Sequence, residues 1–217
     1  MYLNLCTACM SPERFSLFGI IRRMHSANNL KIPCPSRDEV KEYLDKWEED
    51  DDLKETSNKL TELFTKTYPK NDDYYEVWIK VQVLNSAFNV NVPEIHKVAK
   101  HISMQKKVEV EMIRIGHGAH RKGARNESDL YSFATKYCSF CNPPDENPIF
   151  DSNVKRALIY FKEHCGFEFN GDLRRYQNFV CIIKNFKKVF GLNSSFRDVD
   201  KYLYLVGREL NPPKKKL

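Results

Sequence analysis

The sequence predicts an all-α protein with about eight to ten helices, on two observations. Apolar residues recur at intervals of three and four through most of the chain, and the alternation typical of strands never persists for more than a few residues. Pro, Gly and Ser separate these segments, as expected of residues that cap or end helices. With 41% hydrophobic residues among 217, the chain is long and apolar enough to bury a substantial core.

Four helices are expected in the first half of the chain. Ser36 should cap the first, because Glu39 follows it at the spacing of a capping box. The third helix is apolar on nearly every side, so we expect it to be the central buried helix. Pro93 suits the first turn of the fourth helix. The expected ranges are residues 36–49, 53–67, 72–84 and 92–102.

Four more helices are expected in the second half. An apolar run at residues 108–115 leads into a basic turn with glycines at residues 116–123. Ser128 or Asn126 should cap the helix that follows this turn, and Gly191 should end the longest helix. The expected ranges are residues 129–140, 151–164, 172–190 and 195–207.

The charges are segregated along the chain. The net charge is +6, from 35 Lys and Arg against 29 Asp and Glu. Residues 38–76 are acidic, whereas residues 100–125 and the C-terminal tail are basic. This segregation permits one positive face and a polyanionic partner. The alternative is a scatter of solvated charges with no common partner.

The sequence predicts no membrane span, because it has no run of about 18 apolar residues. The apolar patch at residues 15–21 lacks the features of a signal peptide. Seven cysteines fit a reducing cytosol better than a disulfide scaffold, so we expect a cytoplasmic protein. Two Cys-x-x-Cys pairs, Cys6/Cys9 and Cys138/Cys141, could together bind zinc. Buried cysteine is also an ordinary core residue, and we expect neither a metal nor a cofactor.

One carboxylate lies where an irregular segment becomes a helix. Pro148 disfavours helix before it, and Asp151 follows at the position of an N-cap. Capping is the ordinary role of such a residue. The position also fixes a carboxylate in place, because a helix N-terminus favours negative charge.

Three segments around Asp151 carry a resemblance to a known family. They are Val83–Val92, which ends a buried helix in a polar turn, Asp129–Cys138, which follows the basic turn, and Pro148–Arg156. The last is similar to a Pro-Val-Asp-Thr-His-Val-x-Arg stretch whose Asp is catalytic. Together they resemble the helix-hairpin-helix DNA glycosylase superfamily, which includes endonuclease III, the adenine glycosylase and the 8-oxoguanine glycosylase.

The resemblance implies a two-lobed helical fold with a cleft between the lobes. Residues 72–165 would form one lobe, and residues 36–71 with 166–210 would form the other. Residues 1–35 remain as an N-terminal arm, and residues 211–217 as a basic tail.

The resemblance also implies a monomeric DNA N-glycosylase that binds double-stranded DNA, flips out a damaged or modified base and excises it. Asp151 would stabilise the oxocarbenium-like transition state. Helix capping and core packing are the alternatives for the base-pocket candidates, which are Asn85, Phe88, Asn89 and Ser132. A solvated basic loop is the alternative for most of the DNA-binding candidates, which are Gly116, His117, Gly118, Arg121, Lys122, Arg125 and Arg156.

The second catalytic candidate is Lys136. The family's lyase lysine lies 18 or 19 residues before the catalytic Asp, where this chain has Phe133 or Ser132. Lys136 is one turn further along, so the sequence favours a glycosylase without the lyase step and leaves Lys136 as the candidate if that step exists. The chain also lacks the family's four-Cys iron–sulfur spacing, and Asn153 replaces its His.

Two other functions remain open on the sequence alone. One is a non-catalytic helical module that binds nucleic acid, and the other is a helical interaction protein, for defence or regulation, in which Asp151 is only a cap. The glycosylase interpretation makes a geometric prediction that separates it from these. Asp151 should face a cleft shared with the Asn85–Asn89 turn and the Ser132–Lys136 helix face.

Overall fold

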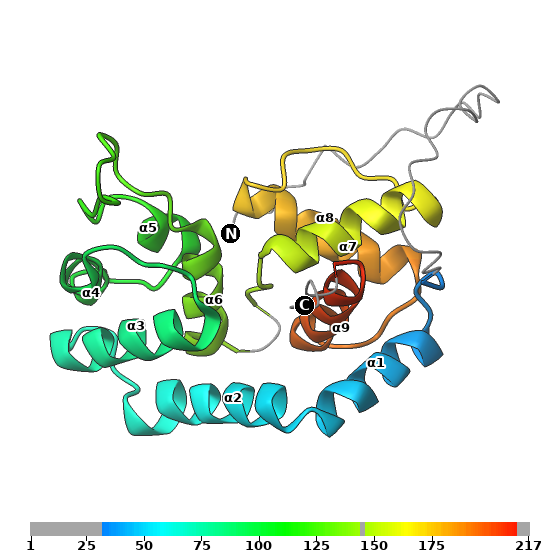
Figure 1. Ribbon diagram of the computed structural model, residues 1–217, viewed down its shortest axis with the longest axis horizontal. Helices are drawn as coiled ribbons and strands as arrows, with labels where there is room; N and C mark the ends of the chain where they lie inside the picture. Colours follow the sequence, from blue (N-terminus) through cyan, green and yellow to red (C-terminus); the bar gives the residue numbers. More distant parts are fainter. Residues whose placement is uncertain (1–31, 144–145, 212–217) are drawn as a thin grey trace, which may run out of the picture. The chain divides into compact units, whose positions relative to one another are not determined.

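The described part of the chain is helical, as the sequence predicts. The computed structural model describes residues 32–143 and 146–211, which contain nine α-helices, one short π-helix and no strand (Figure 1). The π-helix, η1 (Leu63–Thr67), directly continues α2. The α-helices are α1 (Arg37–Glu49), α2 (Asp51–Glu62), α3 (Tyr74–Phe88), α4 (Ile95–Ser103), α5 (Val110–Arg114), α6 (Tyr131–Cys141), α7 (Ser152–His164), α8 (Tyr176–Val189) and α9 (Phe196–Glu209).

Short polar residues begin most of these helices, as expected of N-caps. The Ser36 hydroxyl accepts a hydrogen bond from the Glu39 backbone N–H, as the capping-box spacing predicted. Asp73 caps α3 through its carboxylate. Ser195 and Asp198 form a complete capping box at the start of α9.

Helix α4 begins later than expected, at Ile95 after its N-cap Glu94, so Pro93 lies before the helix and not in its first turn.

Helices α6 and α8 also begin later than expected, and a local turn explains each case. Helix α6 begins at Tyr131, whose N–H donates to the Asp129 carboxylate at 3.1 Å, so neither Ser128 nor Asn126 is the cap. Helix α8 begins at Tyr176 rather than at residue 172, because the Asp172 carboxylate accepts an N–H two residues on and closes a turn. Such side-chain hydrogen bonds compete with the first turn of a helix.

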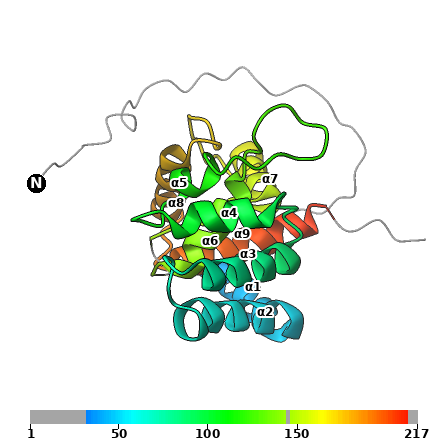
Figure 2. The same ribbon diagram turned by 90° about the vertical axis from the view of Figure 1, so that its left-hand side faces the viewer.

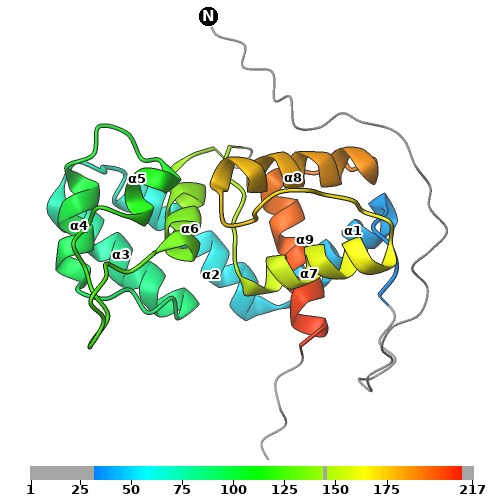
Figure 3. The ribbon, with the colours of Figure 1, turned by 90° about the horizontal axis from the view of Figure 1, so that it is seen from above.

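Helix α6, rather than α3, is the central helix. Every residue from Phe133 to Phe140 is buried. The expectation for α3 was wrong, because its outer side leaves Tyr75 75%, Trp78 38% and Val83 38% exposed. In Figures 1 and 3, α6 lies between the group α3–α5 and the group α7–α9. The apolar residues on every side of α3 therefore did not show which side of this helix faces solvent.

Two clusters of buried side chains hold the described helices together. The end of α2 and helices α3–α6 form the first, which faces the viewer in Figure 2, and helices α1, α7, α8 and α9 form the second. This grouping differs from the expected lobes, since α7 packs with α8 and α9 while Leu60 and Phe64 of the α2–η1 segment pack with α3–α6. Phe150 and Tyr176 pack against both clusters and join them.

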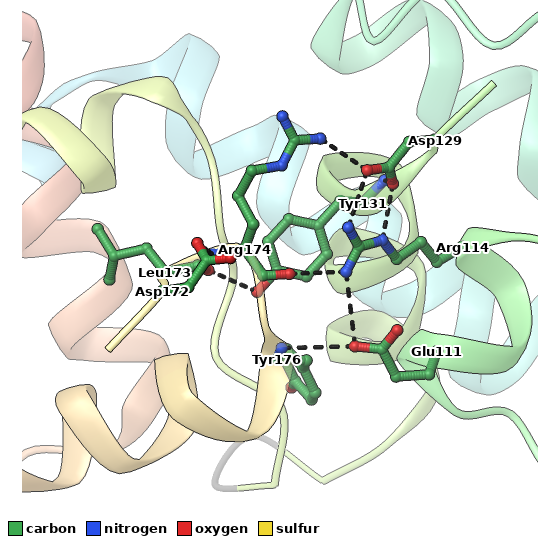
Figure 4. Close-up of polar contacts among 8 residues, drawn as sticks. All are labelled: Glu111, Arg114, Asp129, Tyr131, Asp172, Leu173, Arg174 and Tyr176. Atoms are coloured by element: carbon green, nitrogen blue, oxygen red, sulfur yellow. Dashed lines mark hydrogen bonds and ion pairs between the residues drawn. The ribbon is translucent and has the colours of Figure 1, made fainter. Parts of the chain in front are cut away.

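A polar network also joins the two clusters (Figure 4). The Arg114 guanidinium donates to both carboxylate oxygens of Asp129, at 2.7 and 2.8 Å, and to the carbonyl of Arg174 at 2.6 Å. Arg174 in turn donates to Asp129 at 2.6 Å. The Tyr131 hydroxyl donates to the carbonyl of Leu173 at 3.0 Å. These bonds fix the start of α6 against the turn that precedes α8.

A disulfide joins Cys34 to Cys165, with 5.5 Å between their Cα atoms, and so links the segment before α1 to the end of α7. The sequence had favoured a reducing cytosol over a disulfide scaffold, and this disulfide departs from that expectation. The two residues are 131 positions apart, so no local spacing could reveal the pair. Cys6, Cys9 and the basic residues 212–217 lie outside the described residues. None of the described helices is long and apolar enough to cross a bilayer.

Candidate active site

A cavity of about 270 Å³ lies among α1, α2, α3, α6, α7 and α9. Protein pockets for drug-sized ligands run from about 300 to 1,000 Å³ and are mostly apolar with a few placed polar groups. This cavity therefore suits a smaller ring system. Its aromatic wall consists of Trp47, Phe88, Phe140 and Tyr204. Its charged lining consists of Asp52, Lys136, Asp151, Arg197, Asp200 and Lys201.

A second, more open hollow of about 560 Å³ lies along α2 and η1. Its lining is acidic and apolar, with Asp51, Glu55 and Leu63 among its residues. It holds none of the catalytic candidates, so we place the candidate active site in the smaller cavity.

The segment Ile149–Asp151 is held in place by three different helices. The N–H of Ile149 donates to the Asp200 carboxylate of α9 at 2.9 Å. Phe150 donates its N–H to the Thr135 hydroxyl of α6 at 3.1 Å. Asp151 caps α7, because its Oδ1 accepts the N–H groups of the second and third residues after it, each at 2.9 Å. The carboxylate of Asp151 therefore has a fixed position at the cavity wall.

Lys136 lies beside this carboxylate and is buried. Its Nζ is 3.4 Å from Asp151 Oδ2 and donates to the Ser132 hydroxyl at 3.0 Å. The side chain is only 4% exposed. Burial lowers the pKa of Lys136, while the neighbouring Asp151 acts in the opposite direction. A buried amine with a lowered pKa is available as a nucleophile nearer to neutral pH than an exposed lysine.

The predicted pairing of Asp151 with the Lys136 helix face is present, and Phe88 lines the same cavity. Ser132 does not line the cavity, and its hydroxyl accepts a hydrogen bond from Lys136 Nζ. The two asparagines have structural roles instead. Asn85 accepts the N–H of Val92 at 2.8 Å, and Asn89 ends α3 in the left-handed conformation with φ of 48°. Neither asparagine lines the cavity.

Two backbone amides of the basic turn already donate to carboxylates of the protein. The N–H of Gly118 donates to the Glu127 carboxylate at 2.7 Å, and that of His120 donates to Glu94 at 2.9 Å. His117 is buried, its Nδ1 lies 3.2 Å from the same Glu127 carboxylate, and burial lowers its pKa. Carboxylates thus occupy the place that we expected for a DNA phosphate. The candidates that are exposed are Gly116, Gly118, Arg121, Lys122 and Arg125.

Arg156, another DNA-binding candidate, connects two helices. Its guanidinium donates to Asn153 at 2.8 Å and to the carbonyl of Gly207 at 2.9 Å. These bonds hold the first turn of α7 against the end of α9. A Cβ placed on Gly207 would lie 2.2 Å from the carbonyl oxygen of Asn153, so only glycine permits this approach.

Seven charged or aromatic residues of the cavity were not predicted from the sequence as site residues: Trp47, Asp52, Phe140, Arg197, Asp200, Lys201 and Tyr204. A signal for one of them was present. Asp200 lies four residues after Phe196 and three before Leu203, on the apolar face of α9, where a carboxylate is unusual. A charged residue in phase with a core stripe is therefore the pattern that could have located it.

The zinc hypothesis gains no support from the described residues. Cys138 is buried in the core, and burial raises its pKa. The Cys141 thiol faces Asn71, and burial raises its pKa to about 12. In the part of the chain that the structure describes, no group of three or more His, Cys, Asp or Glu is arranged to hold a metal.

The comparisons with known proteins identify a family. The profile of the family HI_0787_N, described as an N-terminal domain, matches residues 39–145, a range that includes Lys136 and ends before Asp151. An uncharacterized protein of Haemophilus influenzae is 33% identical over 166 residues, which cover 72% of this chain and 79% of that relative. No solved structure matches the chain. At this identity and coverage, the chain belongs to the HI_0787_N family.

Proposed function

We propose that this protein is a DNA N-glycosylase that excises a damaged or modified base from double-stranded DNA. The observation that carries the proposal is the meeting of Asp151 and Lys136, 3.4 Å apart, in a cavity with aromatic walls. Breaking a glycosidic bond builds positive charge on the sugar, which a fixed carboxylate stabilises. A flipped base needs aromatic surfaces on which to stack, and Phe88, Trp47 and Tyr204 supply them.

Lys136 adds a nucleophile to this reaction. Its amine would form a bond to C1′ of the sugar as the base leaves, and the resulting Schiff base would lead to strand cleavage. The sequence favoured a glycosylase without this lyase step. The burial of Lys136 and its position beside Asp151 favour the alternative, so we include the lyase step in the proposal.

The proposed DNA contacts are electrostatic. Arg121 and Lys122 on the basic turn and Arg125 just after it are exposed and would approach the phosphates with their side chains. The backbone N–H groups of Gly118 and His120 already donate to carboxylates, so they would contribute less to phosphate binding than unbonded N–H groups. We propose that the protein acts as a monomer. We also propose that it acts in the cytoplasm, where cellular thiols would reduce the Cys34–Cys165 disulfide.

The test of the function is base release from a panel of duplexes, each carrying one lesion or modified base. Asp151→Asn should lower the single-turnover rate of base release by roughly 10²–10³-fold while DNA binding persists, since Asn still caps a helix. Asp73→Asn is the matched control, because Asp73 caps α3 in the same way and lies outside the cavity. This control should retain full activity.

The outcomes separate the proposal from its alternatives. A non-catalytic nucleic-acid-binding module would bind the duplexes and release no base, with or without Asp151. An interaction protein for defence or regulation would not bind the duplexes at all. Either result, obtained with the complete panel, contradicts the proposal.

A further inference from the structure

Asp200 is the buried group of the cavity that the reaction above does not use. Its residue is only 5% exposed. Oδ2 accepts the N–H of Ile149 at 2.9 Å, whereas Oδ1 is buried and has no hydrogen-bond partner among the described residues. An unsatisfied buried carboxyl oxygen is costly, so a functional role is the first explanation to seek. Asp200 lines the same cavity as Asp151 and Lys136.

The surroundings of Asp200 favour its neutral form. Burial raises its pKa well above the ordinary value, and the nearby carboxylate of Asp151 acts in the same direction. The hydrogen bond from the Ile149 N–H and the charges of Arg197 and Lys136 lower this pKa, and burial outweighs them. Two further charged groups, Asp52 and Lys201, line the cavity. Oδ2 is already an acceptor, so the proton of a neutral Asp200 belongs on Oδ1, the oxygen without a partner.

The cavity thus contains two carboxyl groups in different environments. Asp151 faces an amine and two backbone N–H donors. Asp200, in contrast, lies on the apolar face of α9 and is buried. Pairs of carboxyl groups with contrasting environments divide the acid and charge-stabilising roles in glycosidic cleavage. Asp151 has the charge-stabilising role, which leaves the acid role to Asp200.

We infer that Asp200 is a catalytic acid that gives its proton to the departing base; this rests on the proposed glycosylase function. As the C1′–N bond breaks, its electron pair passes to the base. The O–H bond of Asp200 breaks at the same time, its pair stays on the carboxylate, and the proton forms a new bond to the base. The Lys136 amine bonds to C1′, so the new negative charge on Asp200 is matched by a new positive charge on nitrogen. Hydrolysis of the lysine adduct later returns the proton.

The substrate class follows from this step. A neutral purine leaves poorly as an anion and gains most from protonation, whereas a purine methylated at N7 already carries positive charge and needs no proton. Asp200 is therefore expected to act on neutral bases. General acids contribute about 10²–10⁴-fold to such steps.

The first experiment compares two duplexes, one with a single hypoxanthine or 8-oxoguanine and one with a single 7-methylguanine. Asp200→Asn should slow release of the neutral base by about 10²–10⁴-fold and change release of 7-methylguanine little. Asp198→Asn is the control, because Asp198 lies on the same helix and outside the cavity. An equal loss on both duplexes, or no loss on either, overturns the inference. If the parent protein releases no base from any duplex of the panel, the proposed function itself fails.

The second experiment needs no activity. With a raised pKa, the folded protein holds a proton on Asp200 that the unfolded chain loses near its ordinary pKa of 3.8, so this residue costs stability as pH rises above that value. Asp200→Asn removes this dependence. The free energy of unfolding of the variant, relative to the parent, should therefore increase as pH rises above about 4. A difference that is constant with pH shows that Asp200 is ionised, which contradicts the acid role.

Discussion

Asp151 uses its two carboxylate oxygens for different purposes. Oδ1 accepts two backbone N–H groups and holds the start of α7, while Oδ2 faces Lys136 in the cavity. The same residue can therefore serve as the helix cap and as the proposed catalytic carboxylate. The sequence predicted the cap at Asp151 correctly, because capping depends on the local chain. It left Lys136 undecided, because the burial of a single lysine on a helix depends on which other helices surround it.

At the residue scale we predict a covalent adduct between Lys136 and a duplex with a single abasic site, trapped by borohydride. Only the free amine attacks, so adduct formation should rise with pH and level off below the ordinary lysine pKa of 10.5, because burial lowers the pKa of Lys136. Asp151→Asn should shift this rise to lower pH, since Asp151 raises that pKa. Lys136→Gln should abolish the adduct. Lys162→Gln should retain it, because Lys162 donates to the carbonyl of Phe169 and lies away from the cavity. An adduct that persists in Lys136→Gln contradicts this assignment.

At the scale of elements, most of the helices could be predicted from periodicity and capping residues. Local patterns determine where a helix begins, so Ser36 was identified correctly as a cap. The same patterns did not show that α6 is central or that α7 packs with α9, because partners distant in sequence decide those contacts. Asp200 had a local signal, because it is a carboxylate on the apolar face of α9. That signal did not show that α9 lies against the Ile149–Asp151 segment, which is the contact that places Asp200 in the cavity.

Gly207 is the element-scale feature that permits the contact between α7 and α9. In Gly207→Ala the new Cβ would lie 2.2 Å from the backbone oxygen of Asn153, so α9 must move away from the turn that Asp151 caps. We expect a loss of about 1–3 kcal/mol in the free energy of unfolding, together with slower base release. Arg208→Ala, at an exposed position of the same helix, should change stability by no more than about 0.5 kcal/mol. Equal stability of the two variants in denaturant titrations would contradict the packing argument.

At the scale of the whole described region, two apolar clusters meet at Phe150, Tyr176 and the Arg114 network. The cavity receives residues from both clusters, including Phe140 from one and Val154 from the other. Its geometry therefore depends on how firmly the clusters are joined. Arg114 has five hydrogen-bond donors in a rigid fork, and it uses them to bind Asp129 and the carbonyl of Arg174.

We predict that Arg114→Met weakens this junction. The loss should be roughly 1.5–3 kcal/mol, as is typical of hydrogen bonds to charged groups. Trp47 in α1 and Trp78 in α3 lie in opposite groups of helices, so Trp78→Phe and Trp47→Phe variants report the two unfolding transitions separately by fluorescence. These transitions should coincide in the parent and separate when Arg114 is replaced. Arg121→Met, in the exposed basic turn, is the control. If the two transitions still coincide in Arg114→Met, as they should in this control, the proposed coupling is wrong.

The disulfide between Cys34 and Cys165 gives the chain a ring topology. The ring contains helices α1–α7 and both Lys136 and Asp151, whereas α8, α9 and Asp200 belong to a branch that leaves it. A cut in the backbone at the exposed turn of residues 116–123 opens the ring without releasing a fragment. The two pieces separate only after a thiol reduces the sulfur–sulfur bond.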